Sequence, residues 1–157
     1  MDAIVAIVAL LSILFYFWTS LNGARARGVS KIDAPQMTGH PQLERAVRVQ
    51  MNTLEWLPIY LITLWLFDVF TPKPYGGWIA AGLGVVWIIG RALYLTGYMA
   101  DPAQRSTGFI TQALSCAILL VGALGGAIWA LVRGGLPVRP FQRRNSEPCE
   151  RHTRLRL

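Results

Sequence analysis

FITQALSCAILLVGALGGAIWALV, residues 109–132, is the stretch that decides the fold, because it holds no charged residue. A helix that crosses the hydrocarbon core of a bilayer needs about 20 mostly apolar residues. Three further apolar stretches occupy residues 3–21, 56–70 and 77–98, and a mixed stretch that begins at Leu43 extends the second of them. The sequence therefore predicts an all-α membrane protein that crosses the bilayer as a four-helix bundle.

The composition leaves little chain for a soluble domain. Of the 157 residues, 54% are hydrophobic and 15% are charged, and the mean hydropathy is +0.41. These values are far from those of an ordinary soluble domain. We therefore expect one transmembrane domain at residues 1–135 and a basic, disordered tail at residues 136–157, which would be solvated or meet anionic membrane lipid. We expect no metal centre and no nucleic-acid partner.

The first apolar stretch could be a cleaved signal peptide, but its flanks disfavour that interpretation. A signal peptide opens with a basic region, whereas this chain opens with Met1 and Asp2 and its positive charges come later. The positive-inside rule then favours an uncleaved span, an outside N-terminus and a cytoplasmic first loop. A basic tail after four spans conflicts with this orientation, and we give the first helix more weight. The short loops and the absence of an organelle signal suit a multi-pass protein of a bacterial inner membrane, and we expect its functional site to face the cytoplasm.

Glycine, proline and charge mark the expected breaks between helices. The first helix is expected to end near Gly23, and the second to begin near Pro41 and end at the two prolines of residues 71–74. Prolines so close together cannot continue a helix. Asp101 followed by a proline is typical of a helix N-terminus. This predicts that Arg105 lies in the first turn of the fourth helix.

The second apolar stretch is preceded by ionisable residues, which are costly near a membrane span and by default mark a site. Arg48, Asn52 and Glu55 follow an i, i+4, i+7 spacing, which places a cation, an amide and an anion on one helix face. An internal Arg48–Glu55 ion pair that holds the helix against a neighbour explains the pattern equally well. A proton relay through Glu55 and Asp68 in a small transporter is a less favoured interpretation.

A matching polar stripe lies on the third helix, where Arg91, Tyr94 and Tyr98 share one face and Arg105 follows over the turn. The tyrosines alone would also suit an interfacial aromatic belt. Guanidiniums bind carboxylates, a glutamate binds an ammonium group, and amides satisfy peptide groups. A small zwitterionic peptide with several carboxylates fits this set. If such a peptide carried a thiol, a guanidinium or phenol near that thiol would raise the fraction of reactive thiolate.

Both motifs resemble those of the MAPEG family, the membrane-associated proteins in eicosanoid and glutathione metabolism. The resemblance covers about residues 1–135 and rests on the Glu-Arg-x-x-Arg-x-Gln-x-Asn-x-x-Glu pattern of residues 44–55 and the Arg-x-x-Tyr-x-x-x-Tyr pattern of residues 91–98. It implies a homotrimer of four-helix subunits that binds glutathione between neighbouring subunits. By similarity, the residues that bind glutathione are Arg27, Arg48, Gln50, Asn52, Glu55, Tyr94 and Tyr98.

The resemblance also implies an activity. Arg105 matches the arginine that stabilises the glutathione thiolate in the conjugating members, so it is the expected catalytic residue. The expected function is a detoxifying membrane glutathione transferase or peroxidase, with glutathione as co-substrate and a lipophilic electrophile or lipid peroxide as the other substrate. Gly28 and Trp56 stand where the leukotriene synthases have an arginine and a tyrosine, which disfavours leukotriene-type substrates. The alternative is a non-catalytic lipid-binding member of the same family.

Overall fold

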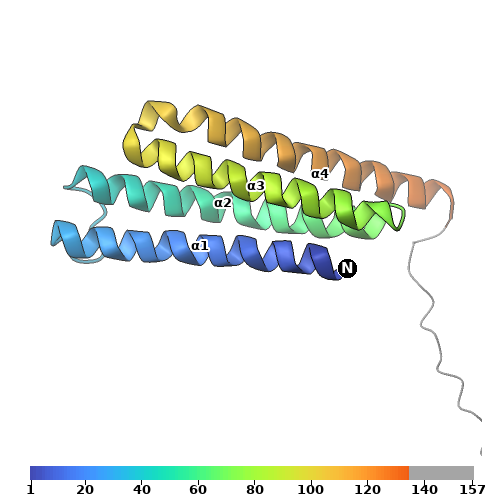
Figure 1. The fold of residues 1–157 in the computed structure, drawn as a ribbon, viewed down its shortest axis with the longest axis horizontal. Coiled ribbons are helices and arrows are strands. Elements are labelled where there is room, and N and C mark those ends of the chain that lie inside the picture. Colours follow the sequence, from blue (N-terminus) through green and yellow to red (C-terminus); the bar gives the residue numbers. More distant parts are fainter. Residues whose placement is uncertain (135–157) are drawn as a thin grey trace, which may run out of the picture.

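The computed structural model describes residues 1–134 as a bundle of four long helices (Figure 1). Each long helix is long and apolar enough to cross a membrane, which confirms the predicted all-α membrane fold. The expected basic tail, residues 136–157, lies outside the described residues. The helices are α1 (Ala3–Ser30), α2 (Pro41–Phe70), α3 (Tyr75–Ala100) and α4 (Ser106–Val132), with a short 3-10 helix, η1 (Pro102–Arg105), directly before α4.

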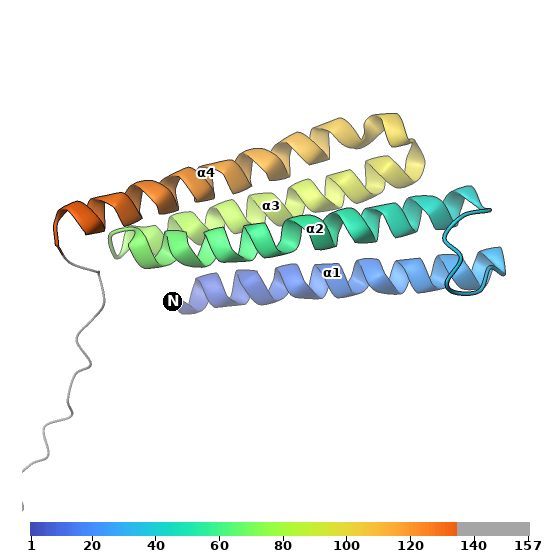
Figure 2. The ribbon, with the colours of Figure 1, turned by 180° about the vertical axis from the view of Figure 1, so that it is seen from behind.

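Consecutive helices run in opposite directions, so that the ends of α1 and α3 lie beside the starts of α2 and α4 (Figure 1; Figure 2). We call this the arginine end of the bundle, because it carries Arg25, Arg27, Arg45, Arg48 and Arg105. The opposite end holds the N-terminus, the α2–α3 turn and the end of α4. This topology brings polar residues from separate parts of the sequence to one border of the membrane.

The first helix ends at Ser30, later than the expected position near Gly23. Gly23 is buried where α1 meets α2, and a Cβ atom at this position would lie 2.9 Å from Oε1 of Gln50. The glycine therefore allows a close helix contact and does not end the helix. The first loop is correspondingly short, because α1 closes at Lys31 in the left-handed conformation, with φ of 55°.

The other helix boundaries lie within two residues of those expected from the sequence, except at the start of α4; α3, for example, begins at Tyr75 rather than at Gly77. Asp101 caps as predicted, since its Oδ1 accepts a hydrogen bond from the backbone N–H of Ala103 at 3.0 Å. The residues that follow form η1 rather than the first α-helical turn, so Arg105 immediately precedes α4. The 3-10 segment is narrower than an α-helix and rises more per residue. It therefore sets how far Arg105 reaches over the end of α3.

The backbones of α3 and α4 approach closely at the arginine end because glycines lie in their contact. A Cβ atom on Gly108 would lie 2.1 Å from the backbone nitrogen of Tyr94, and one on Gly97 would lie 2.7 Å from the carbonyl oxygen of Gln104. Any larger residue would push the two backbones apart. The contact therefore fixes the position of Arg105 relative to the end of α3.

Large apolar side chains cover the outside of the bundle. Trp78 and Leu131, for example, are 67% and 82% exposed. A surface of this kind is unfavourable in water and suits the hydrocarbon core of a bilayer. Inside the bundle, the rings of Tyr60 and Trp87 stack with their centroids 4.1 Å apart, and the hydroxyl of Ser12 donates a hydrogen bond to the Tyr60 hydroxyl at 3.1 Å.

Candidate functional site

A pocket of about 440 Å³ opens at the arginine end between α2, α3 and the start of α4. It is lined by both charged and apolar side chains. Four residues that the sequence predicted for the site meet here, although they come from three different segments of the chain. The lining residues are Arg48, Asn52, Tyr94, Arg105, Ser106, Phe109 and Ile110.

Two further predicted residues adjoin this pocket through direct contacts with its lining. Glu55 accepts a hydrogen bond from Nδ2 of Asn52 at 3.3 Å. The rings of Tyr94 and Tyr98 stack with centroids 5.6 Å apart, and the guanidinium carbon of Arg105 lies 5.9 Å from the Tyr98 ring centroid. The polar stripes of α2 and α3 therefore face the same region, as the helical spacing predicts.

The alternative interpretation of α2 as the holder of an internal ion pair finds no support. Arg48 and Glu55 are both exposed, and within residues 1–134 no salt bridge joins them. Glu55 instead contacts the Asn52 amide. A cation and an anion therefore stand at the pocket without neutralising one another, which suits a ligand that itself carries both charges.

Gln50 and Arg27 do not reach this pocket within one chain. Gln50 lies about 200° around α2 from Arg48 at 100° per residue, and its side chain contacts α1 where Gly23 makes room. Nη1 of Arg27 donates a hydrogen bond to the carbonyl oxygen of Gln36 at 2.6 Å, in the first loop. The predicted residues thus divide into two groups on different sides of α2.

Arg91 lies behind the pocket, although it shares a face of α3 with the two tyrosines. It is fully buried, and its Nη1 donates hydrogen bonds to Asn52 Oδ1 at 3.0 Å and Gln112 Oε1 at 2.8 Å. Its Nη2 donates to the hydroxyl of Thr53, and its guanidinium carbon lies 4.7 Å from the Tyr94 ring centroid. Because Arg91 occupies Oδ1 of Asn52, the amide must present Nδ2 to Glu55 and the pocket.

Every hydrogen-bond acceptor that Arg91 uses is a neutral group. No aspartate or glutamate in the described part of the chain forms an ion pair with it. Its Nε has no hydrogen-bond partner there, and neither has Nε2 of Gln112. A buried cation that no carboxylate contacts directly is costly, so the pocket is backed by a positive charge that no ion pair neutralises.

Asp68 belongs to a separate ion-pair cluster at the opposite end of the bundle. It is 1% exposed, pairs with the Lys73 ammonium, and accepts a hydrogen bond from the backbone N–H of Asp2 at 3.0 Å. Burial by itself would lower the pKa of Lys73, but its hydrogen bonds and charge interactions with Asp2 and Asp68 outweigh this and raise the pKa. Glu55 lies about 20 Å away along the helix. Asp68 therefore has a structural explanation that requires no proton relay.

Ser106, Phe109 and Ile110 line the pocket but were not predicted as site residues. They follow an i, i+3, i+4 spacing directly after Arg105, and this spacing places them on one face of α4. Phe109 also contacts the ring of Trp56 edge-on, with centroids 5.6 Å apart. The periodicity after Arg105 was the signal that could have identified them.

The chain matches the model of the MAPEG family over residues 5–125. It is 40% identical to an uncharacterized protein of Synechocystis sp. over 126 residues, and this alignment covers 80% of this chain and 89% of that protein. It is 36% identical to human microsomal glutathione S-transferase 2 over 78% of this chain and 81% of that protein. Leukotriene C4 synthase of Cavia porcellus is 32% identical, over 80% and 81% respectively. Because the family model matches most of the chain and the alignments cover more than four fifths of each of these relatives, the chain belongs to the MAPEG family.

Proposed function

We propose that this protein is a membrane-bound glutathione transferase that activates the thiolate of glutathione for attack on a lipophilic electrophile or a lipid peroxide. The observation that carries the proposal is the meeting of Arg48, Asn52, Tyr94 and Arg105 around one pocket at the border of the membrane. Polar side chains at that depth are costly and mark a site. The name of the human relative supports glutathione as the co-substrate.

The polar groups of the pocket complement those of glutathione, which has two carboxylates, an ammonium group, two peptide groups and a thiol. Arg48 suits a carboxylate, because a guanidinium forms two parallel charge-assisted hydrogen bonds with it. Glu55 suits the ammonium group. Asn52 offers Nδ2 to a peptide carbonyl, since Arg91 already occupies its Oδ1. The Tyr94 and Tyr98 hydroxyls complete the part of the binding set that a single chain supplies.

Arg105 is the residue to which we assign catalysis. Its guanidinium would lie beside the sulfur, where a positive charge lowers the pKa of the thiol and stabilises the thiolate. The thiol proton leaves to water at the open pocket, and the sulfur then forms a bond to the electrophilic carbon while the leaving group departs. With a peroxide, the sulfur attacks one peroxide oxygen and the O–O bond breaks. The alkoxide takes a proton from water and leaves as an alcohol, and a second glutathione thiol converts the resulting sulfenic acid to the disulfide with release of water.

The second substrate would enter sideways from the lipid. Phe109 and Ile110 form the apolar edge of the pocket and are 38% and 62% exposed on the outside of α4. A hydrophobic molecule dissolved in the bilayer can therefore reach the sulfur without crossing water. Detoxification of such molecules is the role that we propose.

The separation of Gln50 and Arg27 from the pocket supports a site that two subunits share. The exposed face of α2 between the two groups carries Met51 and Leu54, each 42% exposed. If this face packs against a neighbouring subunit, the neighbour's Arg27 and Gln50 can approach the pocket from outside. A head-to-tail contact of this kind closes into a ring, and we propose a homotrimer. Chemical cross-linking in membranes should then give a ladder that ends at three subunits.

We propose that the arginine end faces the cytoplasm of a bacterial inner membrane. This end carries five arginines together with Lys31, whereas the other end carries Lys73 and Arg133 in the described part of the chain. Cytoplasmic loops are enriched in positive charge. Reporter fusions after residue 134 would test the orientation, because the end of α4 lies on the side opposite to the arginine end.

The decisive test compares two substitutions in the pocket. Arg105→Ala should lower kcat for conjugation of a generic electrophile about 100-fold, with a small change in the affinity for glutathione. Glu55→Ala should chiefly weaken glutathione binding. Arg133→Ala, which removes an exposed arginine at the opposite end, is the matched control and should retain wild-type turnover.

Two outcomes would contradict the proposal. Equal and small effects of the two pocket substitutions would remove the assigned roles of Arg105 and Glu55. A wild-type protein that binds glutathione at saturation but neither conjugates an electrophile nor reduces a peroxide would favour the non-catalytic lipid-binding alternative.

A further inference from the structure

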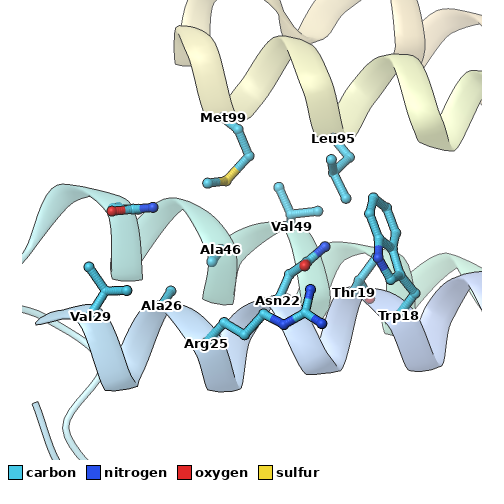
Figure 3. A pocket seen from close by; sticks show the side chains of 11 residues that line it. Trp18, Thr19, Asn22, Arg25, Ala26, Val29, Ala46, Val49, Leu95 and Met99 are labelled. Atoms are coloured by element: carbon cyan, nitrogen blue, oxygen red, sulfur yellow. The ribbon is translucent and has the colours of Figure 1, made fainter. Parts of the chain in front are cut away.

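A second pocket at the arginine end takes no part in the proposed glutathione chemistry. It has a volume of about 360 Å³ and lies between α1, α2 and α3 (Figure 3). We call it the α1–α3 pocket. Its lining includes Trp18, Asn22 and Arg25 from α1, Val49 from α2, and Leu95 and Met99 from α3.

A single charged side chain, Arg25, stands among the residues that line this pocket. Arg25 is exposed, and no hydrogen bond or ion pair within residues 1–134 engages it. Figure 3 shows its side chain bent along α1, with the guanidinium beside the Asn22 amide. Gln42 contributes a second amide to the lining. The polar part of the pocket thus offers one unpaired positive charge and two amides.

The rest of the α1–α3 pocket is apolar. Leu95 and Met99 extend from α3 toward α1, and Val49 and Ala46 form the floor on α2 (Figure 3). Val49 and Leu95 are 2% and 9% exposed, and they pack in one buried cluster with Tyr94. This cluster separates the α1–α3 pocket from the pocket to which we assign glutathione, so the two pockets are distinct sites.

We propose that the α1–α3 pocket binds a long-chain fatty acid, with the carboxylate at Arg25 and the acyl chain against Val49, Leu95 and Met99. One guanidinium matches one carboxylate, with which it forms two parallel hydrogen bonds, and the Asn22 amide can donate a third. The volume is near the low end for ligand pockets. It therefore suits one acyl chain and not the two chains of a phospholipid.

The proposed subunit contact leaves this pocket open to the membrane. Arg27 follows Arg25 by two residues, which places it about 200° around α1. Trp18, Asn22 and Arg25 lie on the pocket side of the helix, whereas Arg27 lies on the side that we assign to the neighbouring subunit. A fatty acid could therefore enter from the bilayer in the assembled protein. The inference does not depend on glutathione turnover.

The experiment uses the full chain in phosphatidylcholine vesicles and a palmitate analogue that carries a photoreactive diazirine in its acyl chain. After illumination, peptide mapping should find the probe on residues that line the α1–α3 pocket, and unlabelled palmitate should compete. The methyl ester of the same probe should label these residues about tenfold less, because it loses a charge-assisted hydrogen bond. Arg25→Gln should lower labelling by the carboxylate probe to the level of the ester.

Two further variants separate the site from general effects of charge and folding. Lys31→Gln removes an exposed cation from the same end without touching the pocket lining and should label like the wild type. Ala46→Phe should fill the pocket and exclude the probe, with a melting curve to verify that the variant folds. Equal labelling by acid and ester, labelling unaffected by Arg25→Gln, or equally strong competition by phosphatidylglycerol would each overturn the proposal.

Discussion

Replacing Gly108 with alanine tests whether the α3–α4 contact positions Arg105, the arginine to which we assign catalysis. The added Cβ would lie 2.1 Å from the backbone nitrogen of Tyr94 and 2.7 Å from the carbonyl oxygen of Gly90, whereas ordinary contacts begin at 3.4 Å. Backbone atoms cannot rotate away as a flexible side chain can. The two helices must therefore separate by about 1 Å or more, and such overpacking costs about 1–3 kcal/mol.

The separation should affect the proposed chemistry more than it affects folding. Tyr94 lies on one side of the contact, and Arg105 lies three residues before Gly108 on the other. A displacement of about 1 Å between catalytic groups can cost on the order of 100-fold in rate. We therefore expect Gly108→Ala to lower the turnover of glutathione conjugation by about that factor, although most of the protein still folds.

Gly82→Ala on α3 and Gly125→Ala on α4 are matched controls, because a Cβ at either position would meet no atom within 4 Å. Both should keep wild-type turnover, since alanine is also the better helix former. The assay is turnover at saturating glutathione, read alongside thermal unfolding in detergent. Wild-type turnover in Gly108→Ala, or an equal loss in Gly125→Ala, would refute the reasoning.

Three other substitutions give distinct expected outcomes. Asp68→Asn should lower the free energy of unfolding by about 2 kcal/mol, without changing turnover, because Asp68 lies at the end opposite to the pocket. The fold raises the pKa of Lys73. The stabilisation that the Lys73 charge contributes is therefore complete below the ordinary pKa of lysine and is lost as the pH rises through the raised pKa. The melting temperature of the wild type should therefore fall more steeply with rising pH in that alkaline range than the melting temperature of the Lys73→Met variant does. Arg91→Met should destabilise the fold by about 2 kcal/mol and weaken glutathione binding, because Asn52 loses the bond that orients its amide; wild-type affinity would contradict this role.

Four spans could be predicted from the sequence because their lengths and apolar content follow from bilayer thickness alone. The end of the first helix could not. Gly23 is compatible with both a helix end and a close helix contact, and only the approach of Gln50 from α2 distinguishes them. The Asp101 cap was identified correctly, since a cap is a local feature. The 3-10 turn that precedes Ser106 depends on how α3 and α4 pack, which local sequence does not encode.

The predicted site shows the same division between local and long-range information. Arg48, Asn52 and Glu55 share a face because they share a helix, and helical spacing is sufficient to group them. Helical spacing does not predict how deeply a side chain on that face is buried in the bundle. Arg91 lies on the face of Tyr94 yet turns inward, because Thr53 and Gln112 on neighbouring helices accept its hydrogen bonds.

The buried charge of Arg91 explains why the pocket should prefer an anionic ligand. Its hydrogen-bond acceptors are neutral, so no direct ion pair cancels its positive charge, and the low dielectric of the bundle weakens the field less than water would. Arg48 and Arg105 add two further cations around the same pocket. A bound glutathione, with two carboxylates and an ionised sulfur, would add the negative charge that Glu55 alone does not supply. Because a ligand that binds only the folded state stabilises it, glutathione should raise the melting temperature of the wild type, and the increase should be smaller in Arg91→Met, where the central cation is gone.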